Sequence, residues 1–265
     1  MALSKAKLKY LRSLGQKKIR ENEKRFLVEG FRLTSEALSS DFSVDLLTYT
    51  KDFVKSSGHA GLLKQARNRE IEILEVSPRE LEGFADTVTA QGVAALIQQR
   101  EYSVDDVLKI DRRRPLILAL DSVSEPGNVG TTIRTADWFG VSGVLLGKGS
   151  VELYNPKVVR STMGSIFHLP IVTDVKLVEV ISRLRKEGFL VYATTVDGGQ
   201  RYDEAPLGAR GLILLGNEAR GLSADLTRLA DNRISIPRIG KAESLNVGVA
   251  SGILLARFSL KQSVQ

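Results

Sequence analysis

The chain has 265 residues, of which 43% are hydrophobic and 26% are charged. This composition is typical of a globular protein with one large or two modest domains. There is no cysteine and there are only two histidines, His59 and His168, which excludes a disulfide framework and a cysteine nucleophile and disfavours a bound metal. No apolar run is long enough to cross a bilayer, and no signal core follows the basic N-terminus. We therefore expect a cytoplasmic protein without membrane contact.

The formal net charge of +7 is concentrated at the N-terminus. Residues 1–25 carry nine lysines and arginines against two glutamates, so this segment accounts for the surplus of the whole chain. A clustered positive field suits RNA or DNA; the alternative is an amphipathic helix that docks its leucines and keeps its lysines in water. We expect a basic helix over residues 1–25 with these candidate RNA contacts: Lys5, Lys7, Lys9, Arg12, Lys17, Lys18 and Arg20.

Strands and helices alternate in the first half of the chain. Apolar runs predict strands at residues 26–30, 44–50, 71–76 and 93–98, with helices at 32–39 and 51–68, the latter interrupted near Gly58. Ser77-Pro78-Arg79-Glu80 has the N-cap, first-turn proline and third-position glutamate of a helix start. The pattern predicts a small α/β domain over residues 26–100 and a charged linker over residues 101–114.

The second half, residues 115–265, alternates again. Strands are predicted at residues 116–120, 143–146, 189–194, 211–215 and 233–236, and helices at 129–139, 156–166, 177–187, 224–230 and 245–260. These strands are continuous apolar runs, which is typical of a parallel sheet that helices cover on both faces.

Polar, glycine-rich loops follow four of these strands: DSVSEPGNVGTTIR, TTVDGG, GNEARGL and PRIGKAESLN. In an open α/β sheet, ligands bind beyond the carboxyl ends of the strands, although ordinary turn chemistry explains each loop taken alone. Neither the dinucleotide G-x-G-x-x-G spacing nor an ATP-binding glycine loop occurs. The small residues, backbone groups and apolar side chains of these loops suit an adenosine-like ligand that carries no phosphate.

Arg134 lies six residues after Asn128 on the helix that Gly127 opens. Nearly two helical turns separate the two side chains, so both can face the same side. An arginine above a ligand-binding edge is well placed to pair with a phosphate. The alternative is a surface arginine paired with Asp137.

Ser244 and Asn246 flank Leu245 at the start of the last predicted helix. One of the two polar residues would be enough as an N-cap. The second is either surplus or has a ligand.

Three motifs stand together in order: PGNVGTTIRTADWFG (126–140), LLGNEARGL (214–222) and ISIPRIGKAESLNVGVASGI (234–253). The set resembles the SpoU, or TrmH-like, branch of the SPOUT methyltransferases, which methylate the ribose 2′-oxygen of RNA with S-adenosylmethionine. FLVEGFRLTSEAL (26–38) is similar to the family's L30e-like substrate-binding domain. The resemblance implies an α/β fold with a mainly parallel C-terminal sheet, helices on both faces and a deep trefoil knot, preceded by a small L30e-like α/β domain. It also implies a homodimer.

The same resemblance implies an S-adenosylmethionine-dependent RNA (ribose-2′-O) methyltransferase and assigns roles by position. The implied catalytic residues are Asn128, Arg134, Glu218, Ser244 and Asn246. The implied cofactor-binding residues are Thr194, Leu215, Gly216, Ile236 and Leu245. Two positions depart from the family, since Ala219 stands where glycine is common and Arg238 where methionine is common; neither is one of the five catalytic positions.

The implied reaction is displacement of a sulfonium methyl group by a ribose hydroxyl, a weak nucleophile that must lose its proton. A guanidinium with a pKa above about 12 is a poor acceptor. We therefore expect Arg134 to pair with the phosphate beside the target ribose, while that phosphate, a water or Glu218 takes the proton. The L30e-like extension favours rRNA over tRNA as the substrate. The alternatives are a non-catalytic RNA-binding protein, a SPOUT base methyltransferase and a tRNA-specific enzyme.

Overall fold

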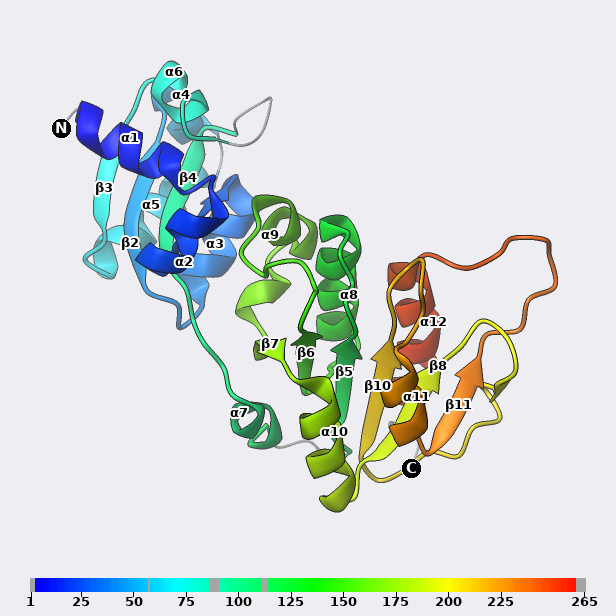
Figure 1. Cartoon of the computed structure of the whole chain (residues 1–265). Coiled ribbons are helices and arrows are strands. Elements are labelled where there is room, and N and C mark those ends of the chain that lie inside the picture. The colour runs from blue at the N-terminus through cyan, green and yellow to red at the C-terminus, as the bar shows by residue number, and fades with distance from the viewer. Residues whose placement is uncertain (1–2, 57, 86–90, 111–113, 261–265) are drawn as a thin grey trace. The chain divides into compact units, whose positions relative to one another are not determined.

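The structure is a computed structural model that describes residues 3–56, 58–85, 91–110 and 114–260 (Figure 1). It has two compact units. Unit 1 comprises Met1–Arg100 and Tyr154–Phe167, and unit 2 comprises Glu101–Leu153 and His168–Gln265. Among the described residues, no helix combines the length and the apolar character needed to cross a bilayer.

A four-stranded mixed sheet forms the centre of unit 1, in the order β1-β4-β2-β3. Strand β4 runs antiparallel to β1 and β2, whereas β2 and β3 are parallel. The strands are β1 (Arg25–Glu29), β2 (Val44–Tyr49), β3 (Glu72–Glu75) and β4 (Val93–Gln98). The apolar runs of the sequence predict all four to within one residue at each end.

The helices of unit 1 also follow the sequence pattern, with one difference at the N-terminus. They are α1 (Lys5–Ser13), α2 (Lys17–Glu23), α3 (Phe31–Ser39), α4 (Lys51–Lys55), α5 (His59–Asn68), α6 (Pro78–Glu82), α9 (Pro156–Thr162) and the 3₁₀ helix η1 (Ser165–Phe167). Residues 1–25 contain two helices instead of the single one expected. The helical conformation is interrupted between α1 and α2. There the Arg20 guanidinium donates to the carbonyls of Leu14 (2.9 Å) and Gly15 (2.8 Å).

The N-terminal helices are part of the core of unit 1. Leu3, Leu11 and Leu14 are buried in one cluster with Leu46 of β2 and Leu96 of β4. Burying a leucine side chain contributes about 1.5–3 kcal/mol to stability. The basic segment is therefore an integral layer of the domain and cannot be removed without exposing its core.

A seven-stranded sheet forms the centre of unit 2, and all of its pairings are parallel. Its order is β7-β6-β5-β10-β8-β11-β9. The strands are β5 (Leu116–Leu120), β6 (Gly143–Gly147), β7 (Ile171–Val175), β8 (Leu190–Thr194), β9 (Gln200–Arg201), β10 (Gly211–Leu215) and β11 (Asn232–Ser235). β7 and β9, the two edge strands, were not among the strands expected from the sequence. β7 exposes two polar residues and β9 has only two residues, so neither gives a continuous apolar run.

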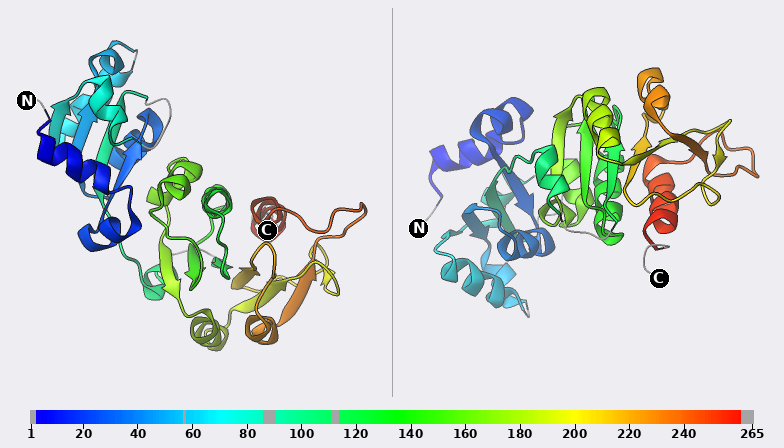
Figure 2. Two further views of the ribbon diagram at one scale, coloured as in Figure 1. Left: turned by 45° about the horizontal axis from the view of Figure 1, so that its top comes forward. Right: turned by 90° about the horizontal axis from the view of Figure 1, so that it is seen from below.

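Helices cover both faces of this sheet, as Figure 2 shows in its left view. They are α7 (Val104–Leu108), α8 (Pro126–Trp138), α10 (Leu177–Lys186), α11 (Ala224–Leu229) and α12 (Val247–Leu260). Ile181 of α10 and Leu226 of α11 share a core cluster with Val191 of β8. On the opposite face, Phe258 of α12 packs edge-on against Tyr192 at 4.6 Å. The trefoil knot implied by the family resemblance stays a prediction.

Helix α7 lies in the segment expected to be a charged linker, residues 101–114. Ser103 and Asp106 form a reciprocal capping box at its start. The hydrogen bonds from Ser103 lower the pKa of the Asp106 carboxyl to about 2. Val107 is buried in the core cluster of unit 2, so this part of the segment belongs to the folded unit.

Candidate active site

Four loops emerge together at one edge of the unit 2 sheet. Strands β5, β10, β8 and β11 are neighbours in that order and run parallel, so their carboxyl ends share this edge. The loops after these strands are the four polar, glycine-rich loops expected from the sequence to bind a ligand. This edge is the candidate active site.

Three of the expected catalytic residues form one chain of hydrogen bonds. Asn128 Nδ2 donates to Glu218 Oε1 at 2.9 Å, and Asn246 Nδ2 donates to Asn128 Oδ1 at 2.7 Å. Asn246 Oδ1 accepts from the backbone N–H groups of Gly248 (2.9 Å) and Val249 (3.3 Å). Asn246 is therefore the N-cap of α12 and a partner of Asn128 at the same time.

The two ends of this chain determine its direction. An ionised Glu218 carboxylate can only accept hydrogen bonds, and the backbone N–H groups of α12 can only donate. Each intervening amide must therefore turn its NH₂ group toward Glu218 and its oxygen toward α12. Ser244 is exposed and makes no hydrogen bond to the described residues. It is therefore not part of this hydrogen-bond series.

A tight loop after β10 positions Glu218. Asn217 Nδ2 donates to the Ser122 carbonyl at 2.8 Å, and its Oδ1 accepts from the backbone N–H groups two and three residues later, at 3.0 and 3.2 Å. Asn217 and Gly221 also exchange two backbone hydrogen bonds. A Cβ on Gly216 would lie 2.2 Å from the backbone carbon of Gly221, so only glycine fits. Asn217 was not among the expected site residues, although a Gly-Asn pair that follows a strand is a turn signal.

Four of the five expected cofactor residues lie at the ends of neighbouring strands. Thr194 Oγ1 at the end of β8 donates to the Leu214 carbonyl at 2.8 Å. Leu215 ends β10 and is buried, Gly216 follows it, and Ile236 follows β11. Small, apolar and neutral groups therefore meet at this edge. Such a set fits an adenosine moiety, which needs no charged partner.

The fifth expected cofactor residue, Leu245, lies on the segment between β11 and α12. This segment extends away from the sheet as a long loop (Figure 1, orange), and residues 237–246 are all exposed. Arg238 ties the loop to the neighbouring one, since its guanidinium donates to Asp197 Oδ1 at 3.2 Å. The side chain of Leu245 is 49% exposed.

Arg134 is exposed on α8, and its guanidinium makes no hydrogen bond or ion pair within the described residues. The alternative partner, Asp137, is engaged elsewhere, because its Oδ2 accepts from His168 Nδ1 at 2.7 Å. The Arg134–Asp137 pair is therefore absent from the structure. The guanidinium is available to an anion from outside the chain.

The structure separates the seven basic residues expected to contact RNA. Lys5, Lys9 and Arg12 are exposed and are spaced to share one face of α1. Lys7 is held by Glu72, with Nζ 2.6 Å from the carboxylate. Lys17 and Lys18 are exposed on α2, and Lys17 lies 3.6 Å from Glu21.

Arg20 is a correction to this set. Only 2% of it is exposed, and its guanidinium donates to two backbone carbonyls at the break between α1 and α2. The prediction that Arg20 contacts RNA is wrong, because its charge is used inside the domain. The helical spacing of the sequence did not separate it from the exposed lysines.

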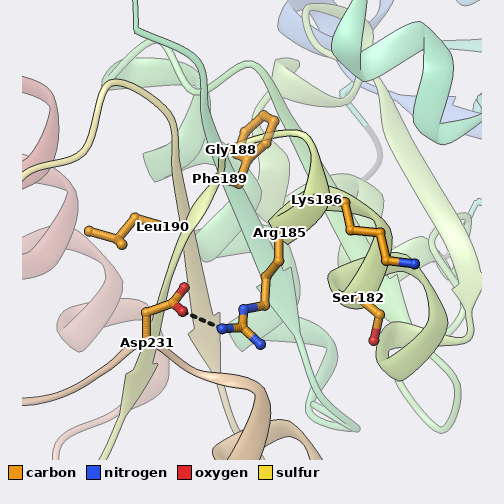
Figure 3. Close-up of a pocket in the computed structure, with 7 residues that line it drawn as sticks. All are labelled: Ser182, Arg185, Lys186, Gly188, Phe189, Leu190 and Asp231. Atoms are coloured by element: carbon orange, nitrogen blue, oxygen red, sulfur yellow. Dashed lines mark hydrogen bonds and ion pairs between the residues drawn. The ribbon is translucent and has the colours of Figure 1, made fainter.

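A cavity of about 540 Å³ lies elsewhere in unit 2. Figure 3 shows its lining residues, which are Ser182, Arg185, Lys186, Gly188, Phe189, Leu190 and Asp231. Arg185 donates to Asp231 at 2.6 Å, and Asp231 also accepts from the Val191 N–H at 2.9 Å. The cavity lies at the amino end of β8, the opposite edge from the catalytic candidates. Its ion pair stabilises the turn into the strand.

Comparison with known proteins matches both halves of the chain. Residues 115–256 match the SpoU rRNA Methylase family, and residues 5–95 match the MRM3-like substrate binding domain. The 23S rRNA (guanosine(2553)-2'-O)-methyltransferase RlmP of Bacillus subtilis is 34% identical over 250 residues, which are 94% of each protein.

Solved structures superpose on nearly the whole chain. The SpoU methyltransferase AviRb from Streptomyces viridochromogenes, in complex with AdoMet, has a TM-score of 0.88 and 28% identity and covers 98% of this chain and 99% of its own. An AdoMet-bound rRNA methyltransferase from Sinorhizobium meliloti has a TM-score of 0.85 and 29% identity, with coverage of 100% and 98%. A structure described as an RNA 2'-O ribose methyltransferase has a TM-score of 0.83 and 28% identity and covers all of both chains.

Proposed function

The chain belongs to the SpoU rRNA methylase family and is an S-adenosylmethionine-dependent RNA 2′-O-ribose methyltransferase, and from this premise we propose that it methylates a guanosine ribose of large-subunit rRNA. The identity of 34% along 94% of both chains to an enzyme named for such a guanosine supports this substrate. We propose that the protein acts in the cytoplasm, where that RNA is made. Unit 1 captures the RNA, and unit 2 carries out the transfer.

The hydrogen-bond chain of Asn128, Glu218 and Asn246 is the observation that carries the proposed active site. These side chains come from the first turn of α8, the loop after β10 and the N-cap of α12, and they converge at the edge where the family resemblance implies catalysis. Glu218 uses one carboxylate oxygen for Asn128, and its other oxygen makes no hydrogen bond within the described residues. That oxygen, the RNA phosphate and a water are the candidate acceptors for the ribose proton. Ser244 at the loop edge approaches the ribose.

Arg134 binds the phosphate beside the target ribose. Its free, exposed guanidinium offers donors in a fork that matches phosphate geometry. The positive charge stabilises the ribose oxygen as it loses its proton and attacks. S-adenosylmethionine, when bound, supplies the methyl group on a sulfonium; Thr194, Leu215, Gly216, Ile236 and Leu245 hold its adenosine moiety.

RNA capture starts with the exposed cations of the N-terminal helices. Lys5, Lys9 and Arg12 on α1, with Lys17 and Lys18 on α2, supply attraction that depends on the phosphate backbone and not on base sequence. The match to a substrate-binding domain over residues 5–95 supports this division. Recognition of a folded segment comes from its shape and its unpaired bases.

A homodimer is the proposed assembly. Helices α8 and α12 pack against each other, and each exposes a large apolar side chain, Trp138 (84%) and Val249 (52%). Leu245, also half exposed, precedes α12. Exposed apolar groups gathered on neighbouring helices indicate an association surface. Docking of a second copy there would cover them beside the candidate active site.

Methyl transfer from labelled S-adenosylmethionine to RNA from a strain lacking this gene tests the proposal. The RNA is digested to nucleosides and resolved by mass, with Arg134→Ala as the control. Labelled 2′-O-methylguanosine from the large-subunit rRNA, lost in the variant, is the expected result. Label on another ribose corrects the nucleotide, and label on a base nitrogen overturns the proposed reaction site.

A further inference from the structure

Three aromatic rings stack at one edge of the unit 1 sheet, and none of them belongs to the candidate active site or to the basic N-terminal helices. Phe31 begins α3 directly after β1, Phe53 lies in α4 directly after β2, and His59 begins α5. Strands β1 and β2 both run antiparallel to β4, so their carboxyl ends share this edge. Three helices therefore each deliver one ring to the same place.

The stack runs from the core to the solvent. Phe53 is only 4% exposed and packs so closely on Gly92 that a Cβ there would lie 3.0 Å from the Phe53 Cβ. His59 stacks on Phe53 with ring centroids 4.1 Å apart, and its Nδ1 donates to the Phe53 carbonyl at 2.8 Å. Phe31 stacks on His59 at 4.5 Å and 22°, with 36% of it exposed.

This arrangement holds the outer ring in place before any ligand arrives. The hydrogen bond orients the imidazole, and Phe53 supports it from below. Phe31 therefore offers part of its ring to solvent on a rigid base, and little conformational entropy is lost when another flat group contacts it. An exposed phenylalanine alone is ordinary in a folded protein; a supported stack that reaches solvent is a contact surface.

The charges around the stack indicate what kind of flat group it contacts. Arg32 follows Phe31 directly, and Lys64 and Arg67 lie on the helix that His59 begins. All three are exposed and make no hydrogen bond or ion pair within the described residues. An aromatic face next to the free guanidinium of Arg32, on a surface that also carries Lys64 and Arg67 farther along α5, fits a ligand that has a planar ring and negative charge, which is the chemistry of a nucleotide.

We propose that the Phe31–His59–Phe53 stack binds an unpaired base of the substrate RNA, with Arg32 pairing with an adjacent phosphate. The proposal rests on the proposed function, because it presumes an RNA substrate, and it assigns a base-reading site to unit 1. Unpaired bases of folded RNA are recognised by stacking on phenylalanine, tyrosine and histidine rings. A purely apolar surface cluster is the competing account, and it gives the free Arg32 next to Phe31 no role.

Substitutions at Phe31 test the site in the full-length protein. Phe31→Ala and Phe31→Leu remove the ring, and Phe31→Tyr keeps it. Binding of each variant to protein-free 23S rRNA is measured. Stacking contributes about 1–3 kcal/mol per base, so the first two substitutions should weaken RNA binding about 5- to 150-fold. The tyrosine variant should bind like the wild type. The affinity for S-adenosylmethionine should not change in any of them.

A fluorescence measurement tests stacking directly. The chain has one tryptophan, Trp138. The wild-type protein is therefore the control, since its fluorescence shows how the emission of Trp138 alone changes when RNA is added. Phe31→Trp adds a second indole at the proposed contact. A short oligoadenylate, which offers only unpaired bases, should quench the emission of Phe31→Trp more than that of the wild type. Equal quenching would overturn the proposal.

The outcomes separate this proposal from the proposed function. If wild type methylates rRNA and Phe31→Ala and Phe31→Leu keep its RNA affinity, the stack is not a base site and the methyltransferase function stands. If wild type methylates no guanosine ribose but Phe31→Trp is quenched selectively by oligoadenylate, the base site stands and the proposed substrate fails. If Phe31→Leu binds RNA as tightly as the wild type and only Phe31→Ala binds more weakly, the apolar-cluster account is supported and the base site is overturned.

Discussion

Asn128 Nδ2 lies 2.9 Å from Glu218 Oε1, although 90 residues separate them in the sequence. Asn246, 118 residues after Asn128, donates to the other end of the same amide. A carboxylate, two amides and a helix N-terminus thus form one directed series of hydrogen bonds that joins three segments distant in the sequence. Each side chain in this series is oriented by the hydrogen-bonding groups of its neighbour. A substitution at one of the three residues should therefore disturb the hydrogen bonds of the other two.

Asn128→Asp should disrupt this chain at neutral pH. The new carboxylate cannot donate to Glu218, and two carboxylates at this distance repel, which raises the pKa of the pair. We expect kcat for RNA methylation to fall about 10²–10³-fold. As the pH falls, one carboxyl group takes a proton and can donate again, so the ratio of variant to wild-type kcat should rise. A ratio independent of pH would contradict this role of Asn128.

Arg134→Lys should keep measurable activity, whereas Arg134→Ala should lose about 10²–10³ in kcat. The lysine keeps a positive charge for the phosphate but loses the planar fork of donors. Steady-state methylation of 23S rRNA with both variants measures the difference. A lysine variant as inactive as the alanine variant would show that fork geometry or proton transfer, and not charge, is the contribution of Arg134.

Gly216→Ala should abolish binding of S-adenosylmethionine. The added Cβ would lie 2.2 Å from backbone atoms of the loop that holds Glu218, so the strand end and the loop must separate. Gly240→Ala is the matched control, because no atom lies within 4 Å of a Cβ at that position in the exposed segment before α12. Calorimetric titration with S-adenosylmethionine should show heat of binding for the control only.

Arg20→Ala should lower the free energy of unfolding by about 1–3 kcal/mol, because the buried carbonyl of Leu14 and the partly buried carbonyl of Gly15 lose their donor. Replacing Lys5, Lys9 and Arg12 together by glutamine should instead leave stability nearly unchanged. It should reduce the slope of log K for RNA against log salt by about 2 to 3. Urea unfolding and binding at several salt concentrations test both expectations. A reduced salt dependence of RNA binding in Arg20→Ala would show that Arg20 contacts RNA after all.

Trp138→Glu should convert the proposed homodimer to a monomer, because a charge would be buried in the apolar surface of α8 and α12. Val178→Glu is the control, since Val178 is also an exposed apolar residue but lies on α10, across the sheet. Light scattering at micromolar protein concentration gives the mass. A monomeric wild type would refute the assembly outright.

Local pattern was enough for most of the fold. Continuous apolar runs place β5 and β10 at their observed bounds, because a strand buried on both faces admits almost no polar residue. The same rule fails for β7 and β9, since an edge strand faces water and carries polar residues. The family resemblance likewise rests on short motifs, each of which is local.

By itself the sequence determined the parallel sheet, the order of the loops along the chain and the residue types at their tips. Only the tertiary structure decided which of those residues meet. Asn246 contacts Asn128 and Arg20 turns inward because strand order and helix packing bring distant segments together. Neither contact leaves a periodic trace in the chain, and hydrogen bonds between loops depend on distances of a few tenths of an ångström, which spacing along the sequence does not encode.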